Sequence, residues 1–383
     1  MSDENKITIY AFKVIQPYGE YYSAVINSEL LLDVCHSREA EYIDGYITGA
    51  QRKQSEQQKK DIAGFIDSKQ ACFPNNIILS ANYDEDDNIV GFDDRWEFEK
   101  VEGEENLYKI TIHNTKAKSC SIIDGQHRLK AFEYSQKKSM ALSCAIFDTL
   151  EPHAQAEIFS TINFNQRKVD KSLAYQLFGV SLDESKRDTW SPDMLAIYFC
   201  RKFNTNFEPF ENRINYRLKS QEVNKSWNFS TSSFVDGFVK LISKKPKLDR
   251  YEIFNDVVED KPSRKRLDDI EDCPLRKYYI SGDDLAIEQV LNHYFSSVYK
   301  YLWKNVNDKK DNVLVSNIGL LALFDVLYDI LLKRTIDKEL LLSFDKSFKQ
   351  LNIEDYGDKV KFPSTSKGRT AIKVKILQDL NFK

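Results

Sequence analysis

The chain has 383 residues, of which 42% are hydrophobic and 30% are charged, and its formal net charge is −4. This apolar content is ample for a large buried core, and the length favours two domains or one elaborated domain. The slightly acidic balance excludes a domain that is basic throughout, so any contact with nucleic acid must come from a local patch.

The six cysteines form no C-x-x-C pair and no zinc-ligand spacing, so they are predicted to be reduced residues of the core. The longest apolar stretch, 318–332, contains Asp325 and Asp329 and is too short and too charged to span a bilayer. The polar, acidic N-terminus has no signal-peptide pattern. We therefore expect a soluble, cytoplasmic protein without a membrane partner.

The N-terminal part is predicted to be mixed α/β, because short strand-like runs alternate with helical patterns. Strands are expected over 7–15, 21–26, 77–79, 96–101, 108–112, 120–123 and 142–147. Helices are expected from Ser28, after the capping-box pair Ser55 and Gln58, and from Pro152, which suits a first helical turn. Gly103 is predicted to turn the chain between two of the strands.

Beyond about residue 170 the strand signals fade, so the C-terminal part is predicted to be mostly helical. Helices are expected over 173–178, 194–203, 234–242, 285–303 and 313–332, and loops over 220–229 and 257–283. The predicted fold class is α+β, with a mixed α/β domain over residues 1–175 and a helical domain over residues 176–383.

One turn carries most of the functional prediction. The predicted strand at 120–123 ends at Asp124 and Gly125, and a helix is expected to begin at once. Gly125 lets the backbone turn sharply and leaves room for a ligand. The backbone N–H groups of residues 126–128 would have no partner within the helix, and the helix dipole favours an anion there.

The side chains of this turn suit the same chemistry. Arg128 adds a planar donor fork that matches phosphate, and His127 adds a titratable donor. The alternative is structural: Asp124 would cap the helix, His127 would be a satisfied core histidine, and Arg128 would be a surface residue.

The segment SIIDGQHRLKAF around the turn resembles the signature of the DGQHR family, which includes DndB-like proteins of DNA-modification operons. These proteins resemble ParB nuclease-like domains and sulfiredoxin, so the resemblance implies a ParB/sulfiredoxin-like N-terminal domain. The sulfiredoxin turn reads Gly-Gly-Cys-His-Arg; Gly125, His127 and Arg128 match it, whereas Gln126 stands at the cysteine position. Without that thiol, sulfinic-acid reductase chemistry is not expected. The resemblance implies instead that His127 and Arg128 hold nucleotide phosphates.

A second segment, FSTINFNQRKV, resembles another motif of the family and the Glu-Asn-x-x-Arg box of ParB-type domains, which contacts phosphates and the metal. The matching polar residues are Asn163, Asn165, Gln166 and Arg167. The spacing from Asn163 to Arg167 is one residue longer than in ParB, which leaves the role of Asn163 open. The alternative is a helix C-terminus solvated by polar side chains.

A third segment, from Gln51 and Arg52 to Pro74, resembles the first box of the family, which forms one wall of the ParB-type pocket. Gln51 and Arg52 are therefore candidates for reaching a ligand, and a solvated helix start is the alternative. The resemblance is strongest over residues 45–215, and a short segment at 208–214 also resembles part of the family.

Two basic clusters in the C-terminal half are candidates for contacts with DNA phosphates. They contain Lys244, Lys245 and Lys247, and Arg264, Lys265 and Arg266. Acidic residues lie near both clusters, so an ordinary solvated face is the alternative interpretation.

Two functional hypotheses follow, and a nuclease-like or purely scaffolding role is a third possibility. In the first, a DndB-like protein of a DNA-modification or phage-defence pathway, of the phosphorothioation or deazaguanine type, binds ATP or another nucleoside triphosphate with Mg²⁺ and hydrolyses it. Asp124, His127 and Arg128 would be catalytic, and Gly125 and Gln126 would help to bind phosphate. In the second, the protein is a DNA-binding transcriptional regulator of a DNA-modification operon without turnover. Both hypotheses expect DNA and other proteins of such an operon as partners, and a homodimer is compatible with both.

Overall fold

The computed structural model describes residues 6–37, 41–43, 46–48, 56–113, 118–137, 139–165, 171–172, 175, 182–215, 228–255, 261–304, 306, 312–356 and 360–381. The chain forms two compact units. The first contains Met1–Arg167 with Asn255–Glu259, and the second contains Lys168–Phe254 with Asp260–Lys383.

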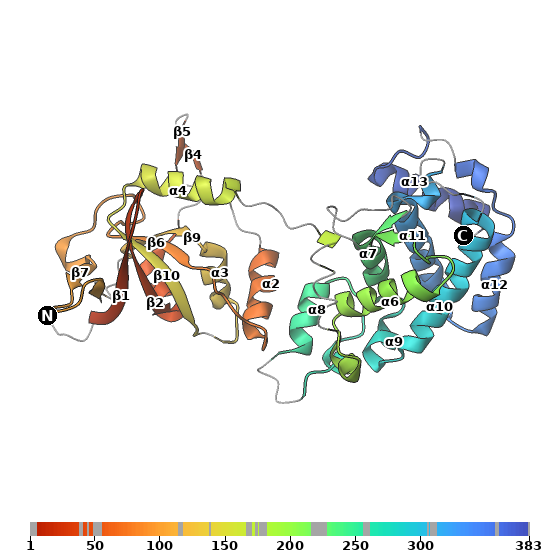
Figure 1. Ribbon diagram of the computed structural model, residues 1–383, viewed down its shortest axis with the longest axis horizontal. Coiled ribbons are helices and arrows are strands. Elements are labelled where there is room, and N and C mark those ends of the chain that lie inside the picture. The colour runs from red at the N-terminus through yellow and green to blue at the C-terminus, as the bar shows by residue number, and fades with distance from the viewer. Residues whose placement is uncertain are drawn as a thin grey trace. The chain divides into compact units, whose positions relative to one another are not determined.

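The first unit is built on an eight-stranded mixed sheet with the strand order β3-β9-β6-β10-β2-β1-β8-β7 (Figure 1). Its strands are β1 (Lys6–Gln16), β2 (Gly19–Asn27), β3 (Cys35–His36), β6 (Ile77–Ala81), β7 (Glu97–Lys100), β8 (Leu107–His113), β9 (Cys120–Asp124) and β10 (Ala141–Asp148). The pairs β6–β10 and β3–β9 are parallel, and the remaining pairs are antiparallel. A separate small hairpin joins β4 (Glu41–Ile43) and β5 (Tyr46–Thr48).

Three helices contribute to the core of this unit, together with one face of the sheet. They are α1 (Ser28–Val34), α2 (Glu56–Asp67) and α3 (Gln126–Lys130), which continues as the 3₁₀ turn η3 (Ala131–Glu133). Each helix contributes a buried aliphatic side chain, namely Leu31, Ile66 and Leu129, to the same core as strand residues such as Ile77 and Ile122. A fourth helix, α4 (Pro152–Asn165), packs against β9.

The second unit is a helical assembly. Its helices are α6 (Pro192–Asn206), α7 (Thr231–Ile242), α8 (Pro246–Ile253), α9 (Arg276–Ser281), α10 (Asp284–Val298), α11 (Asn317–Lys333), α12 (Lys338–Phe348) and α13 (Ser366–Asp379). The helix α11 is buried along most of its length and packs against α7 and α13. The core is aromatic: Phe210, for example, lies 4.8 Å from Phe295 and 5.5 Å from Trp303, measured between ring centroids.

The predicted fold class is confirmed, because a mixed sheet with helices precedes a mostly helical part. Three element predictions need correction. The helix expected over 313–332 begins at Asn317, because Ser316 caps it by accepting the N–H of Gly319 at 3.4 Å. The helix expected to reach Trp303 changes at Tyr299 into a π-helical turn. The loop expected over 257–283 contains the 3₁₀ turn η7 (Arg264–Arg266) and α9.

Helices α8, α12 and α13 were not predicted. The helix expected over 173–178, the capping residue Ser55 and most of the loop at 220–229 fall outside the described residues. Among the residues that the structure describes, none of the helices has the length and apolar content that crossing a bilayer requires.

Candidate functional site

The turn between β9 and α3 is built around Gly125. Its backbone lies in the left-handed region, with φ 98° and ψ 6°. A Cβ atom at this position would lie 2.6 Å from Cδ1 of Ile77 and 3.4 Å from its Cα. The turn therefore needs glycine for two reasons, since a side chain would both strain the backbone and collide with the start of β6.

Arg128 fastens this turn to the segment that precedes β6. One terminal nitrogen, Nη2, donates to the backbone carbonyl of Asn76 at 2.9 Å and lies 3.4 Å from Oδ2 of Asp124. The other, Nη1, donates to the backbone carbonyl of Asn75. The side chain is only 18% exposed. The donor fork that the sequence suggests for phosphate thus binds groups of the chain itself.

Gln126 and His127 each bring one polar atom into the turn that has no hydrogen-bond partner among the described residues. Gln126 is 5% exposed, and its Oε1 atom is buried without a hydrogen bond. The Nδ1 atom of His127 is likewise buried and unpartnered. Buried polar atoms without a partner are uncommon in proteins, so this pair marks the turn as a place that awaits water or a ligand.

The electrostatic surroundings of His127 favour its neutral form. Burial lowers the pKa of the imidazole, the charges of Lys130 and Lys59 lower it further, and the Asp124 carboxylate acts against them. Because an ordinary histidine titrates near 6.5, a lowered pKa leaves the ring mostly neutral at pH 7.

Lys59 reaches the turn from α2, which packs against α3 and η3. Its ammonium group lies 5.6 Å from the ring centroid of Tyr134, whose hydroxyl donates to Oε1 of Glu56 at 3.0 Å. Within the described part of the chain, Lys59 forms no ion pair. Together with Lys130 it places two positive charges near His127, opposed by the Asp124 carboxylate.

Sequence reasoning missed Lys59 and Lys130. A signal for Lys59 exists in the helical period: it stands four and seven residues before the buried Ala63 and Ile66, so it extends the buried stripe of α2 toward α3. If this stripe is interpreted only as core, the lysine at its end is overlooked.

The other predicted ligand residues are not placed. Asn163 and Asn165 belong to the last turn of α4, but the described structure does not include their side chains. Gln166, Arg167, Gln51 and Arg52 fall outside the described residues. Helix α4 nevertheless contacts β9, which ends at the turn, and α2 contacts α3, which begins after it. That these six residues join the site stays a prediction.

Asp124 is the carboxylate that could accompany a metal ion at this turn. Its side chain is 29% exposed and is shared with Arg128. The described residues contain no group of three or more His, Cys, Asp or Glu that could hold a metal by themselves. A Mg²⁺ ion ordinarily takes one or two protein carboxylates and completes its shell with phosphate and water, so a lone Asp124 fits that group when a nucleotide brings the rest.

The residues of the two basic clusters in the second unit differ in how exposed their side chains are. Lys245, Lys247 and Lys265 are exposed, and Lys244 is exposed and paired with Asp272. Arg264, in contrast, is 2% exposed and its guanidinium lies 2.7 Å from Asp284.

The prediction that Arg264 contacts DNA is therefore corrected: burial and the ion pair with Asp284 remove it from the surface. Arg266 is partly buried, and its Nη1 atom donates to the backbone carbonyl of Ile253 at 3.3 Å. Because that carbonyl ends α8, Arg266 joins η7 to α8.

The family model described as "DndB: DNA-sulfur modification-associated" matches residues 9–356. The chain belongs to this family. The family relationship predicted from the DGQHR turn is thereby confirmed. Among solved structures, a C-terminally truncated ParB from Caulobacter crescentus complexed with CTP-gamma-S is 12% identical, with a TM-score of 0.26. That alignment covers 50% of this chain and 88% of the ParB chain. No curated protein matches the sequence.

Proposed function

We propose that this DndB-family chain binds a nucleoside triphosphate, with ATP as the first candidate, together with Mg²⁺ at the β9–α3 turn. Hydrolysis of that nucleotide would then serve the DNA-sulfur modification pathway with which the family is associated. The observation that supports the proposal is the pair of buried polar atoms on Gln126 and His127 that lack a hydrogen bond among the described residues, in a turn to which Lys59 and Lys130 contribute positive charge.

The residues of the turn have different roles in this proposal, which follow from their surroundings. Lys59 and Lys130 supply the positive charge for phosphate oxygens, and Gly125 allows close approach of the backbone. Asp124 would hold Mg²⁺, which neutralises charge that develops on the phosphates during transfer. The neutral imidazole of His127 can accept a hydrogen bond from an attacking water or donate one to a phosphate oxygen.

Arg128 takes a different role in this proposal from the one that the motif suggests. Its guanidinium binds the carbonyls of Asn75 and Asn76 and approaches Asp124. We propose that it is a positioning residue, which fixes the turn and orients Asp124, and that it contacts no phosphate itself.

The test is ATP binding and hydrolysis with Mg²⁺, with and without duplex DNA. His127→Ala and Lys59→Ala should each weaken binding and turnover, while Lys60→Ala, at the exposed neighbouring position of α2, should leave both unchanged. If the wild-type chain binds no nucleotide, or if Lys59→Ala and Lys60→Ala behave alike, the turn is not a nucleotide site.

A second candidate is a DNA-binding regulator of a modification operon. The exposed Lys245, Lys247 and Lys265 favour it, because α8, which begins at Pro246, packs against η7. Binding of duplex DNA should then fall steeply with salt, and each lysine that contacts a phosphate should reduce the salt slope by about one when it is replaced by alanine. If none of the three substitutions changes DNA binding or its salt dependence, this candidate has no support.

A further inference from the structure

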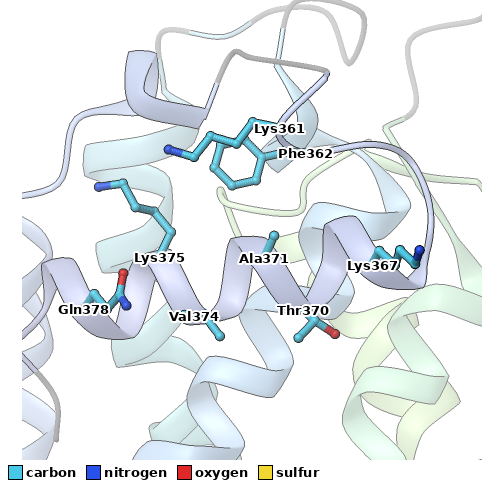
Figure 2. A pocket seen from close by; sticks show the side chains of 8 residues that line it. All are labelled: Lys361, Phe362, Lys367, Thr370, Ala371, Val374, Lys375 and Gln378. Carbon is cyan, nitrogen blue, oxygen red and sulfur yellow. The ribbon is translucent and has the colours of Figure 1, made fainter.

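A groove runs along α13 in the second unit (Figure 2). Its volume is about 550 Å³, which lies within the range of sites that hold ligands. Its walls are α13 and the short segment before it, and they present three lysines, three apolar residues and two neutral polar residues. These residues are Lys361, Lys367, Lys375, Phe362, Ala371, Val374, Thr370 and Gln378.

The groove is held open by core residues. A Cβ atom on Gly368 would lie 1.8 Å from the backbone oxygen of Pro363, so only glycine lets this segment lie against the helix. Phe362 is 1% exposed and anchors the same segment, and Ile372 and Ile376 bury the helix in the core. Both walls therefore exist before anything binds between them.

The cations of α13 fall into two groups. Arg369 and Lys373 are bound to α11, through Asp325 at 2.5 Å and Asp329 at 3.0 Å. Two lysines of the groove differ from them within the described residues: Lys367 is exposed without an ion pair, and Lys375 pairs with Asp379 one turn along α13. That pair is partly buried, with Lys375 27% and Asp379 25% exposed, and Tyr356 also donates to Asp379 at 2.9 Å. A carboxylate of a partner would therefore bind Lys375 beside Asp379, since an ammonium group has three donors.

We propose that this groove binds an acidic, amphipathic segment of a partner protein. Lys367 and Lys375 lie about 12 Å apart along the helix axis, from the rise of 1.5 Å per residue. Between them on the same helical face are Ala371 and Val374, and Val374 is 43% exposed. A helix that carries acids two turns apart with apolar residues between them complements this pattern. The backbone of DNA offers phosphates but nothing apolar for Val374.

The probe is a labelled helical peptide with glutamates two turns apart and leucines between them, titrated with the full chain by fluorescence anisotropy. The reference peptide carries lysine in place of each glutamate. The double variant Lys367→Glu, Lys375→Gln should weaken binding of the acidic peptide roughly five- to tenfold, since each charge pair that solvent can reach contributes little by itself. Val374→Ser should weaken binding through the loss of its apolar contact.

Two matched controls lie on α12. Lys346→Glu and Leu342→Ser change an exposed lysine and an exposed leucine outside the groove and should leave binding unchanged. Circular dichroism checks that every variant is folded. The proposal is overturned by equal binding of both peptides, by no binding, or by equal effects of groove and control substitutions. Duplex DNA that displaces the acidic peptide and is itself lost in the groove variant would assign the groove to nucleic acid instead.

Discussion

Each unit of the chain holds an arginine beside a carboxylate, buried in the second unit and partly buried in the first. The two sites differ in which nearby polar atoms lack a hydrogen bond. In the second unit, Arg276 is 2% exposed and binds Asp249 through two nitrogens, at 2.7 and 3.0 Å. It also donates to the carbonyls of Asp268 and Ile242, and Ser243 donates to Asp249. In the first unit, Arg128 donates to two backbone carbonyls and approaches Asp124 through one nitrogen at 3.4 Å. Among the described residues, the neighbouring Gln126 and His127 each keep one buried polar atom without a hydrogen bond.

The difference separates two uses of a buried polar group. A network in which every donor and acceptor has a partner inside the protein holds helices together and leaves no polar atom for a ligand. In a turn whose backbone is fixed by its arginine, polar side-chain atoms without partners can bind water or a ligand. An arginine within a family motif can therefore belong to the framework, while less conspicuous neighbours face the ligand.

The largest expected effect concerns the network of Arg276. Arg276→Ala leaves the Asp249 carboxylate, itself 8% exposed, without its cation, and should lower the free energy of unfolding by about 3–5 kcal/mol. Urea denaturation measures it. The control is Lys300→Ala, which removes an exposed pair with Asp345 and should cost less than about 1 kcal/mol. Similar losses in the two variants would contradict a structural role for the buried network.

A smaller loss is expected at Gly125. Gly125→Ala must hold a left-handed backbone, at about 1–2 kcal/mol, and must also displace Ile77, so we expect a total of about 2–4 kcal/mol. Gly103→Ala isolates the first effect, because Gly103 has φ 82° and nothing within 4 Å of an added Cβ. The difference between the two variants in thermal or urea unfolding measures the close approach at the turn. Equal losses in the two variants would mean that Ile77 at the start of β6 moves aside at no measurable cost.

A pH-dependent effect is expected at His127. Because burial and the nearby lysines lower the pKa of its imidazole, the unfolded chain binds more protons than the folded chain between that pKa and about 6.5. Stability from this residue is therefore complete above about pH 6.5 and falls as the pH drops through the folded pKa. NMR titration of the ring should show a midpoint below that of a free histidine.

The lysines sharpen this test. Lys59→Ala should raise the pKa of His127, since the charge of Lys59 lowers it, whereas Lys60→Ala should not. His127→Gln should remove this part of the pH dependence of unfolding, and His153→Gln, at a side chain that is 78% exposed, serves as the reference. An imidazole that titrates at or above 6.5 would contradict the described surroundings of the turn.

The smallest effect on stability is expected from the exposed lysines of the second unit. Lys245→Glu, Lys247→Glu and Lys265→Glu should each change the free energy of unfolding by less than about 0.5 kcal/mol, because these residues are exposed. Their effect on DNA binding is then free of folding artefacts. A large loss of stability from any of them would show that the basic cluster is part of the framework, as Arg264 is.

Local patterns were sufficient for much of the first unit. Strand-like β-branched and aromatic residues predicted β1 and β2, alternating apolar residues predicted β7 and β8, and an apolar run predicted β10. The apolar run that ends at Asp124 and Gly125 predicted the strand–turn–helix arrangement. These features depend on period and on glycine, which act over a few neighbouring residues. Helix α13 escaped prediction because its charged residues mask a narrow buried stripe at Gly368, Ile372 and Ile376.

The amino-acid sequence by itself determined the family, the order of a sheet-containing part before a helical part, and the turn at Asp124 to Arg128. Only the tertiary structure decided what the charged side chains do. Arg264 finds Asp284 twenty residues away and Arg128 finds the carbonyls that precede β6, while Lys59 approaches His127 from another helix. Whether a cation is free or engaged depends on which distant groups the fold brings within a few ångströms, and residue spacing along the chain carries no information about those distances.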